Sequence, residues 1–179
     1  QVLCPMIRGT VGTQSINVAL QNHLNPHGKP INNYFRIGDK VIAQHNNYEK
    51  KIFNGDVGII QDCIDSEVII DFDHTVVSMS LDDLSEIKLA WATTIHKSQG
   101  SEYPVVIAPI LISHYMLLER NLLYTAITRG KSRVFLITDK KALYMTLNTQ
   151  KSHLRQTKLA DRLQELAQNP CIEYDNWTD

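Results

Sequence analysis

The chain has 179 residues, of which 43% are apolar and 21% are charged. This length allows one full hydrophobic core, or one domain that carries a small insertion. The 18 basic and 19 acidic residues nearly cancel each other. A general attraction to nucleic acid is therefore not indicated, and any such binding has to be local.

The cysteines and histidines predict no metal site. Three cysteines lie far apart and without C-x-x-C spacing, namely Cys4, Cys63 and Cys171. They fit a reducing, cytoplasmic compartment and predict neither a disulfide framework nor a zinc site. The seven histidines form no ligand-spaced pair. The longest apolar region, residues 105–118, is interrupted by Pro109 and His114, and no secretory signal opens the chain, so we expect no membrane association.

The first segment, residues 1–6, is typical of a short strand. Because the chain begins with Gln1 inside this strand rather than with Met, we expect it to be a fragment of a longer protein. A helix is predicted over residues 13–24, and Asn25-Pro26 ends it. Its expected buried stripe has helical spacing and consists of Ile16, Ala19, Leu20, His23 and Leu24.

Residues 35–80 are rich in short strand patterns, which predict a small β-barrel inserted into the rest of the chain. The expected strands are residues 40–44, 57–61, 68–72 and 76–79. Asn54-Gly55 predicts a tight type I′ turn, in which both central residues have positive φ. We assign residues 33–86 to this insertion.

Strands and helices alternate from residue 88 onward. Strands are expected at residues 88–92, 105–108 and 133–138, with helices at 118–128, from 140 and at 154–168. This alternation favours an α/β layer with a mostly parallel sheet.

A polar block follows the strand at residues 88–92. Thr93 or Thr94 is suited to cap a short helix, and Gly100 to end it. The threonine hydroxyls, with His96 and Lys97, are donors that suit a phosphate. Glu102 is better suited to accept a hydrogen bond from a hydroxyl, such as one of a ribose. The alternative is a capped, solvated loop over a sheet edge, which composition alone favours.

The helix at residues 118–128 has two different faces. Leu122, Leu123, Ala126 and Ile127 are expected to be buried, and Asn121, Tyr124, Thr125 and Thr128 form a polar stripe. Arg129 follows at the helix end, where its rigid guanidinium suits a triphosphate. The alternative is an arginine that binds the last helix carbonyls.

Arg8 follows the first strand, and ligands of open α/β sheets bind beyond the carboxyl ends of strands. We expect Arg8, the polar block and Arg129 to converge there. The alternative for Arg8 is an exposed turn residue.

Four ordered stretches resemble one family. ATTIHKSQGSE (92–102) resembles helicase motif V, LLYTAITRGKSRV (122–134) resembles motif VI, and QVLCPMIRG (1–9) resembles the strand that carries motif IV. The stretches IGDKV (37–41) and FNGDVG (53–58) resemble the inserted SH3-like subdomain of RecD-like helicases. The chain is thus similar to the second RecA-like domain of a RecD-like superfamily 1 DNA helicase, the branch of the exodeoxyribonuclease V alpha subunit.

The resemblance implies a P-loop NTPase-type RecA-like fold over residues 1–32 and 87–179, and a bacterial protein of DNA repair and recombination. It implies catalytic roles for Arg129, which would reach the γ-phosphate of ATP, and for Arg8. Positions near the nucleotide are Gln99, Gly100, Glu102 and Tyr124. Positions near single-stranded DNA are Thr93, Thr94, His96 and Lys97. Helicases of this branch move 5′ to 3′.

No G-x-x-x-x-G-K-[ST] loop occurs in the chain, so it has no cradle for the β- and γ-phosphates and no Ser/Thr ligand for Mg²⁺. The resemblance implies that ATP and Mg²⁺ are bound with another, N-terminal RecA-like domain. We therefore expect the chain alone to be inactive as an ATPase and as a helicase. Subunits of a nuclease complex are further possible partners.

Two other functions stay open at this point. Lys40, Lys50 and Lys51 lie near Tyr48 and Phe53 in the insertion, a combination typical of single-strand binding but also compatible with a spacer or a protein-docking role. The whole chain could then be a non-catalytic module that binds single strands or protein. A fragment of a relaxase-helicase is the remaining alternative.

Overall fold

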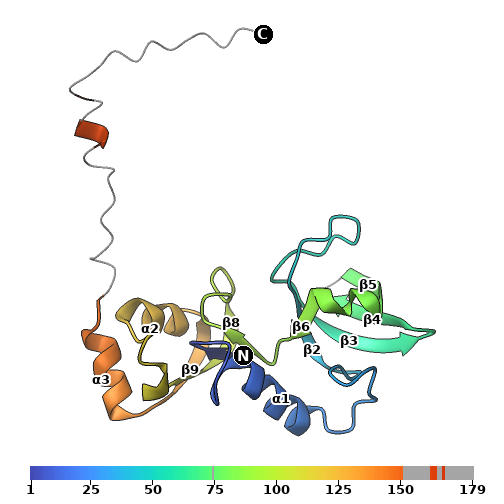
Figure 1. The fold of residues 1–179 in the computed structure, drawn as a ribbon, viewed down its shortest axis with the longest axis horizontal. Coiled ribbons are helices and arrows are strands. Elements are labelled where there is room, and N and C mark those ends of the chain that lie inside the picture. The colour runs from blue at the N-terminus through green and yellow to red at the C-terminus, as the bar shows by residue number, and fades with distance from the viewer. Residues whose placement is uncertain (74, 151–161, 165–166, 168–179) are drawn as a thin grey trace. The chain divides into compact units, whose positions relative to one another are not determined.

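The computed structural model of the protein describes residues 1–73, 75–150, 162–164 and 167 (Figure 1). The chain divides into two units, residues 1–149 and residues 150–179. In the second unit, residues 162–164 and 167 are helical. The remainder of the helix predicted over residues 154–168 lies outside the described residues, as does Cys171.

Four strands form a parallel sheet, which confirms the predicted α/β class. They are β1 (Val2–Cys4), β7 (Ala92–Thr94), β8 (Tyr103–Ile110) and β9 (Gly130–Thr138). Their order is β7-β1-β8-β9, and every neighbouring pair is parallel. The helices α2 (Arg120–Ile127) and α3 (Lys140–Asn148) follow β8 and β9. Their apolar side chains share one core with the sheet, in which Val106, Leu118 and Leu122 are buried.

Five strands form a separate antiparallel sheet, which confirms the predicted β-rich insertion. They are β2 (Lys40–Ala43), β3 (Val57–Ile64), β4 (Glu67–Phe72), β5 (Thr75–Ser80) and β6 (Ile87–Leu89). Their order is β5-β4-β3-β2-β6, and a short 3₁₀ helix, Asp82–Glu86, lies between β5 and β6. This sheet has its own core, which includes Val41, Ile60 and Ile70.

The single strand predicted over residues 88–92 is wrong. Its first part belongs to β6, which pairs with β2, whereas its last residue begins β7, which pairs with β1. Ala90 and Trp91 connect the two sheets. Both strands bury apolar residues, so the apolar pattern runs across the bend without a break. The antiparallel sheet therefore continues to Leu89, past the predicted end of the insertion at residue 86.

The predicted type I′ turn at Asn54-Gly55 is also wrong. Gly55 has φ +102°, but Asn54 is not among the residues with positive φ. The tight hairpin turn lies instead at Asp65-Ser66, between β3 and β4, where φ is 49° and 71°. Asp tolerates this left-handed conformation because its short polar side chain bonds locally, so the signal was present but weaker than Asn-Gly.

The helix α1 (Thr13–Leu24) forms where predicted, but it buries a different face. Its buried residues are Thr13, Asn17 and Gln21, while Leu24 is 61% exposed. Asn17 lies over the connection between the two sheets. Its Nδ2 donates to the carbonyls of Leu89 (3.1 Å) and Ala92 (2.9 Å), and its Oδ1 accepts from the amide of Ala92 (2.7 Å). The predicted apolar stripe is wrong because this helix packs on polar backbone groups, which require hydrogen-bonding side chains.

Further polar contacts join α1 to the start of the antiparallel sheet. The fully buried carboxylate of Asp39 accepts from Gln21 Nε2 (2.5 Å), Asn25 Nδ2 (2.8 Å) and the amide of Arg36 (2.7 Å). A buried carboxylate is tolerated when several donors satisfy it. Asn17 and Asp39 together connect α1 to both sheets. Among the described residues, no helix is long and apolar enough to span a membrane.

Candidate nucleotide and nucleic-acid site

The candidate residues lie at two opposite edges of the parallel sheet. Thr94 ends β7 and Arg8 follows β1, so both lie at the carboxyl edge. Arg129 directly precedes β9 and Glu102 directly precedes β8, so both lie at the amino edge. The expectation that Arg8 and Arg129 converge at the carboxyl ends is therefore wrong. The helix α2 runs back across the sheet from β8 to β9, and its C-terminus delivers Arg129 to the amino edge.

Arg129 is bonded to the polar block at this amino edge. Its Nη1 donates to the carbonyl of Ser101 (3.1 Å), and its Nη2 donates to Thr128 Oγ1 (3.3 Å). The amide of Tyr103 donates to the carbonyl of Arg129 (2.8 Å), so the backbone of the two segments is joined as well. The structure thus brings Arg129 next to the residues between Gly100 and Glu102.

The other nucleotide candidates surround this contact. Glu102 is exposed and forms an ion pair with Lys131 (3.3 Å). Gly100 has φ +85°, a conformation that favours glycine, and both Gly100 and Gln99 are exposed. Tyr124 is 70% exposed on α2, one turn before Thr128, whose hydroxyl donates to the Tyr124 carbonyl (3.0 Å).

The two faces of α2 follow the sequence pattern with one exception. Leu122, Leu123 and Ala126 are buried as predicted, and the polar stripe that contains Tyr124 faces outward. Ile127 was expected to be buried but is 45% exposed. It is the last residue of α2.

The carboxyl edge carries the nucleic-acid candidates. Thr93 is only 6% exposed, and its hydroxyl is buried without a hydrogen-bond partner among the described residues. After Thr94 the chain forms a turn instead of the predicted short helix. The amide of Ser98 donates to the Thr94 carbonyl (3.1 Å), the amide of Lys97 donates to Thr94 Oγ1 (3.2 Å), and the buried Ser98 hydroxyl donates to the Ile95 carbonyl (2.7 Å). These local bonds leave His96 and Lys97 exposed.

Lys97 connects this turn to the antiparallel sheet. Its Nζ donates to Oε1 of Gln44, the residue that follows β2 (2.9 Å). Burial lowers the pKa of the Lys97 ammonium, and the nearby charge of Lys88 lowers it further. Sequence reasoning missed Gln44 and Asn17. Asn17 had a signal, since Thr13, Asn17 and Gln21 repeat every four residues on α1, whereas Gln44 had none.

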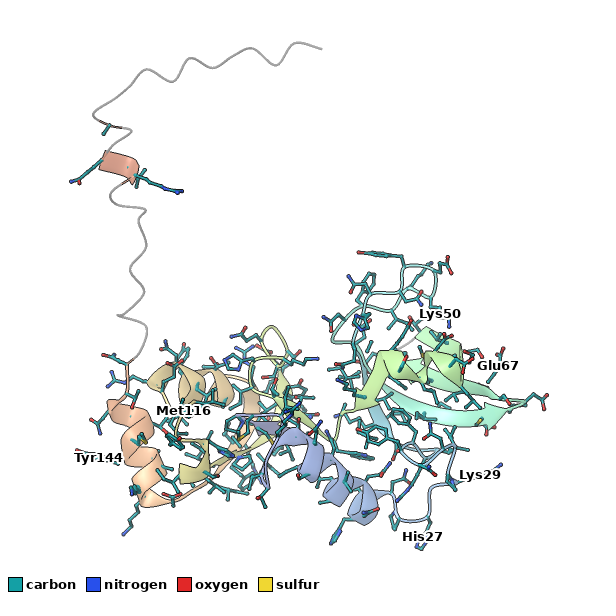
Figure 2. All side chains as sticks on the ribbon, viewed as in Figure 1. His27, Lys29, Lys50, Glu67, Met116 and Tyr144 are labelled. Carbon is teal, nitrogen blue, oxygen red and sulfur yellow. The ribbon has the colours of Figure 1, made fainter. Side chains whose placement is uncertain are left out.

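Some of the basic and aromatic residues of the insertion have contacts within the insertion itself. Lys50 lies in the loop between β2 and β3 and is labelled in Figure 2. It forms an ion pair with Asp83 (3.2 Å). Tyr48 is 75% exposed and makes an edge-on ring contact with Phe53. Within the described residues, no group of acidic, histidine and cysteine side chains is arranged to hold a metal ion.

Two family models match the chain. The UvrD-like helicase C-terminal domain matches residues 89–137, and the ATP-dependent RecD-like DNA helicase SH3 domain matches residues 16–72. The ATP-dependent RecD2 DNA helicase of Deinococcus radiodurans is 34% identical over 166 residues, which cover 91% of this chain. The chain belongs to the RecD-like helicase family.

A RecBCD enzyme subunit RecD of Buchnera aphidicola is 33% identical and covers 84% of this RecD-like chain. The chain spans only about a quarter of the length of these curated relatives, 23% and 27% respectively. Solved Pif1 helicases share the fold. One solved structure is described as two coordinating Pif1 helicases that unwind forked dsDNA. It has a TM-score of 0.57 and 19% sequence identity, and the match covers 93% of this chain and 44% of the Pif1 chain. A Bacteroides Pif1 in complex with ADP-AlF3 and ssDNA has a TM-score of 0.55 at 18% identity, covering 94% and 46%.

Proposed function

We propose that this RecD-like chain acts as the second motor domain of an ATP-dependent DNA helicase that moves 5′ to 3′ on single-stranded DNA. The observation that carries the proposal is the division of the candidate residues between two edges of one sheet. Arg129 and Glu102 lie at the amino edge, and Thr94 and Lys97 lie at the carboxyl edge. A movement of this sheet caused by nucleotide binding or hydrolysis at the amino edge would therefore also move the DNA bound at the carboxyl edge.

The amino edge supplies charge complementarity for a nucleotide. The guanidinium of Arg129 is suited to stabilise the negative charge that develops on a γ-phosphate during hydrolysis. Glu102 is suited to accept from a ribose hydroxyl. Both side chains already have partners, the Ser101 carbonyl and Lys131, with which a nucleotide would compete, but the buried Nε of Arg129 has none among the described residues.

ATP and Mg²⁺ also need groups that this sequence does not contain, because no G-x-x-x-x-G-K-[ST] loop is present. We propose that a further RecA-like domain binds the β- and γ-phosphates and the Mg²⁺ ion. That domain would close against the amino edge of this sheet. The Pif1 neighbour solved with ADP-AlF3 and ssDNA supports the assignment of both ligands to this fold.

The carboxyl edge supplies donors for a DNA backbone. Thr93, Thr94 and His96 carry hydroxyl and imidazole groups, and Lys97 adds a positive charge. Contacts of this kind bind phosphates without reading the base sequence.

The proposal is tested with the isolated chain. A fluorescein-labelled oligothymidylate is titrated with the protein in a fluorescence anisotropy assay, and ATP hydrolysis is measured in parallel with unlabelled oligomer. We expect binding that weakens with salt, and no hydrolysis. Hydrolysis that Arg129→Ala abolishes would contradict the need for a second domain, and an absence of binding would contradict the assignment of the carboxyl edge.

A further inference from the structure

A cavity of about 150 Å³ lies beside the carboxyl edge, between the parallel and the antiparallel sheet. Helix α1 lines it with Asn17, the antiparallel sheet with Ile42 and Leu89, and β7 with Ala92 and Thr93. Tyr34, which is 45% exposed, also lines it. The lining is thus mainly apolar, with one aromatic ring. A cavity of about 150 Å³ is large enough to hold one six-membered aromatic ring.

Polar groups add a second kind of chemistry to this cavity. Lys88, Lys97 and Gln44 contribute to its lining, and none of the described residues that line it is acidic. Neither lysine forms an ion pair with another described residue. Thr93 belongs to the same lining, and its hydroxyl is buried without a partner among the described residues. A buried hydroxyl without a partner costs free energy that a ligand with a polar edge can recover.

We propose that this cavity binds one pyrimidine base of a single-stranded DNA, with an adjacent phosphate at Lys88 and Lys97. An aromatic ring with a polar edge and an attached anion matches the combination of apolar wall, unpartnered hydroxyl and two lysines. This inference rests on the proposed function, because it places the DNA at the carboxyl edge. It adds a contact to a base where the proposed function has contacts to the backbone alone.

The cavity is preformed, since Asn17 fixes its wall. The three hydrogen bonds of the Asn17 side chain fix Leu89 and Ala92, which belong to different sheets, relative to each other. The Lys97–Gln44 bond ties the two sheets together a second time. A site that is rigid before binding loses less conformational entropy when the base enters. The inserted sheet thereby takes part in binding through Ile42, Gln44 and Lys88.

The test is an abasic scan with the isolated wild-type chain. A labelled oligothymidylate carries a short duplex at one end, which fixes where the protein binds along the single strand. A series of such oligomers places one abasic residue at each position of the single strand in turn. We expect the affinity to fall by about tenfold at one position and little elsewhere, in line with the loss of one base contact. At that position, a purine should bind more weakly than thymine or cytosine.

Variants assign the sensitive position to this cavity. Tyr34→Ala removes the aromatic wall, and Thr93→Val removes the hydroxyl at nearly constant volume. Each variant should bind the intact oligomer more weakly than the wild-type chain does. Each should also lose less affinity than the wild-type chain when the abasic residue is at the sensitive position. Tyr144→Ala is the matched control, because Tyr144 is 73% exposed on α3 (Figure 2).

The outcomes separate the two proposals. Binding with a flat abasic scan overturns the base site and leaves the DNA-binding carboxyl edge intact. A sensitive position that neither variant changes also overturns the base site. No binding by the wild-type chain contradicts the proposed function and the base site together.

Discussion

The two edges of the parallel sheet differ in the partners that their polar groups already have. At the amino edge, Arg129 Nη1 is bonded to the Ser101 carbonyl and Glu102 is paired with Lys131, while the buried Nε of Arg129 has no partner among the described residues. At the carboxyl edge, the Thr93 hydroxyl has no partner among the described residues, and a cavity with two lysines lies beside it. Each edge therefore holds a buried polar atom without a partner among the described residues, and a ligand at the amino edge would also compete with the Ser101 and Lys131 contacts. Because the sequence lacks a phosphate-binding loop, we expect hydrolysis to need a second domain, whereas we expect DNA binding at the carboxyl edge to need this chain alone.

The largest expected effect concerns the amino edge. In a protein where a phosphate-loop domain precedes this chain, Arg129→Ala should lower kcat of ATP hydrolysis by about 10³ or more, because the developing phosphate charge loses its cation. DNA affinity should stay nearly constant, since Arg129 lies at the other edge. Steady-state ATP hydrolysis with saturating DNA measures kcat, and fluorescence anisotropy measures the DNA affinity.

Arg133→Ala is the control for this experiment, as Arg133 is exposed on β9. A kcat within a few-fold of wild type for Arg129→Ala would remove Arg129 from the catalytic role.

The next effect concerns the connection between the two sheets. Asn17→Asp replaces the amide that donates to two carbonyls with a buried carboxylate, which only accepts. We expect the free energy of unfolding to fall by about 3 kcal/mol, since two buried acceptors lose their donor. Urea unfolding measures the loss, and DNA affinity should fall as well, because Ala92 directly precedes Thr93.

Asn22→Asp, on the same helix, is the matched control for Asn17→Asp. Asn22 is exposed and its Oδ1 accepts from Arg36 Nη2, a role that a carboxylate keeps. Equal stability losses in the two variants would show that Asn17 has no special role.

A smaller effect is expected at Lys97. Lys97→Ala should weaken binding of an oligothymidylate several-fold and reduce the slope of log affinity against log salt by about 1, the value for one lost phosphate contact. Lys140→Ala, an exposed lysine on α3, should leave the slope unchanged. An unaltered slope in Lys97→Ala would exclude Lys97 from the phosphate contacts.

Lys97 also predicts a pH dependence. Burial and the charge of Lys88 lower the pKa of Lys97, so it loses its proton at a lower pH than an ordinary lysine. Because the charged form binds phosphate, wild-type affinity should fall as pH rises toward the ordinary lysine range. Lys97→Arg should remove that part of the fall, because arginine keeps its charge there. The same pH profile for both proteins would contradict the contact.

The smallest effect on hydrolysis is expected for Arg8→Ala in the protein that contains both domains. The topology places Arg8 at the carboxyl edge, away from Arg129, so kcat should fall by less than about tenfold, well short of an arginine finger's contribution. A loss equal to that of Arg129→Ala would show that Arg8 reaches the nucleotide despite its place in the sheet.

The sequence predicted the elements better than their contacts. The strand and helix alternation predicted the parallel sheet, and the apolar positions of α2 predicted its buried face, because periodicity reports burial directly. The four-residue repeat of Thr13, Asn17 and Gln21 marks one face of α1 but does not show that this face is buried, since a polar face that packs on backbone carbonyls has the same pattern as a solvated one. The bend at Ala90-Trp91 was hidden because residues 89–92 form an apolar run without a turn-forming residue.

The candidate site was predictable as a set of residues but not as an arrangement. The motif-like stretches named Arg129, Glu102, Thr93 and Lys97, yet their division between two edges depends on the direction in which α2 crosses the sheet. The cavity joins residues from α1, both sheets and the polar turn, so no single stretch of sequence could reveal it.

The most direct test of this account is the binding of a labelled oligothymidylate by the isolated 179-residue chain, titrated by anisotropy at two salt concentrations. We predict saturable binding that weakens with salt, weakens again in Lys97→Ala and is unchanged in Arg129→Ala. An absence of binding, or an equal loss in both variants, would contradict the separation of a DNA-binding edge from a nucleotide-binding edge.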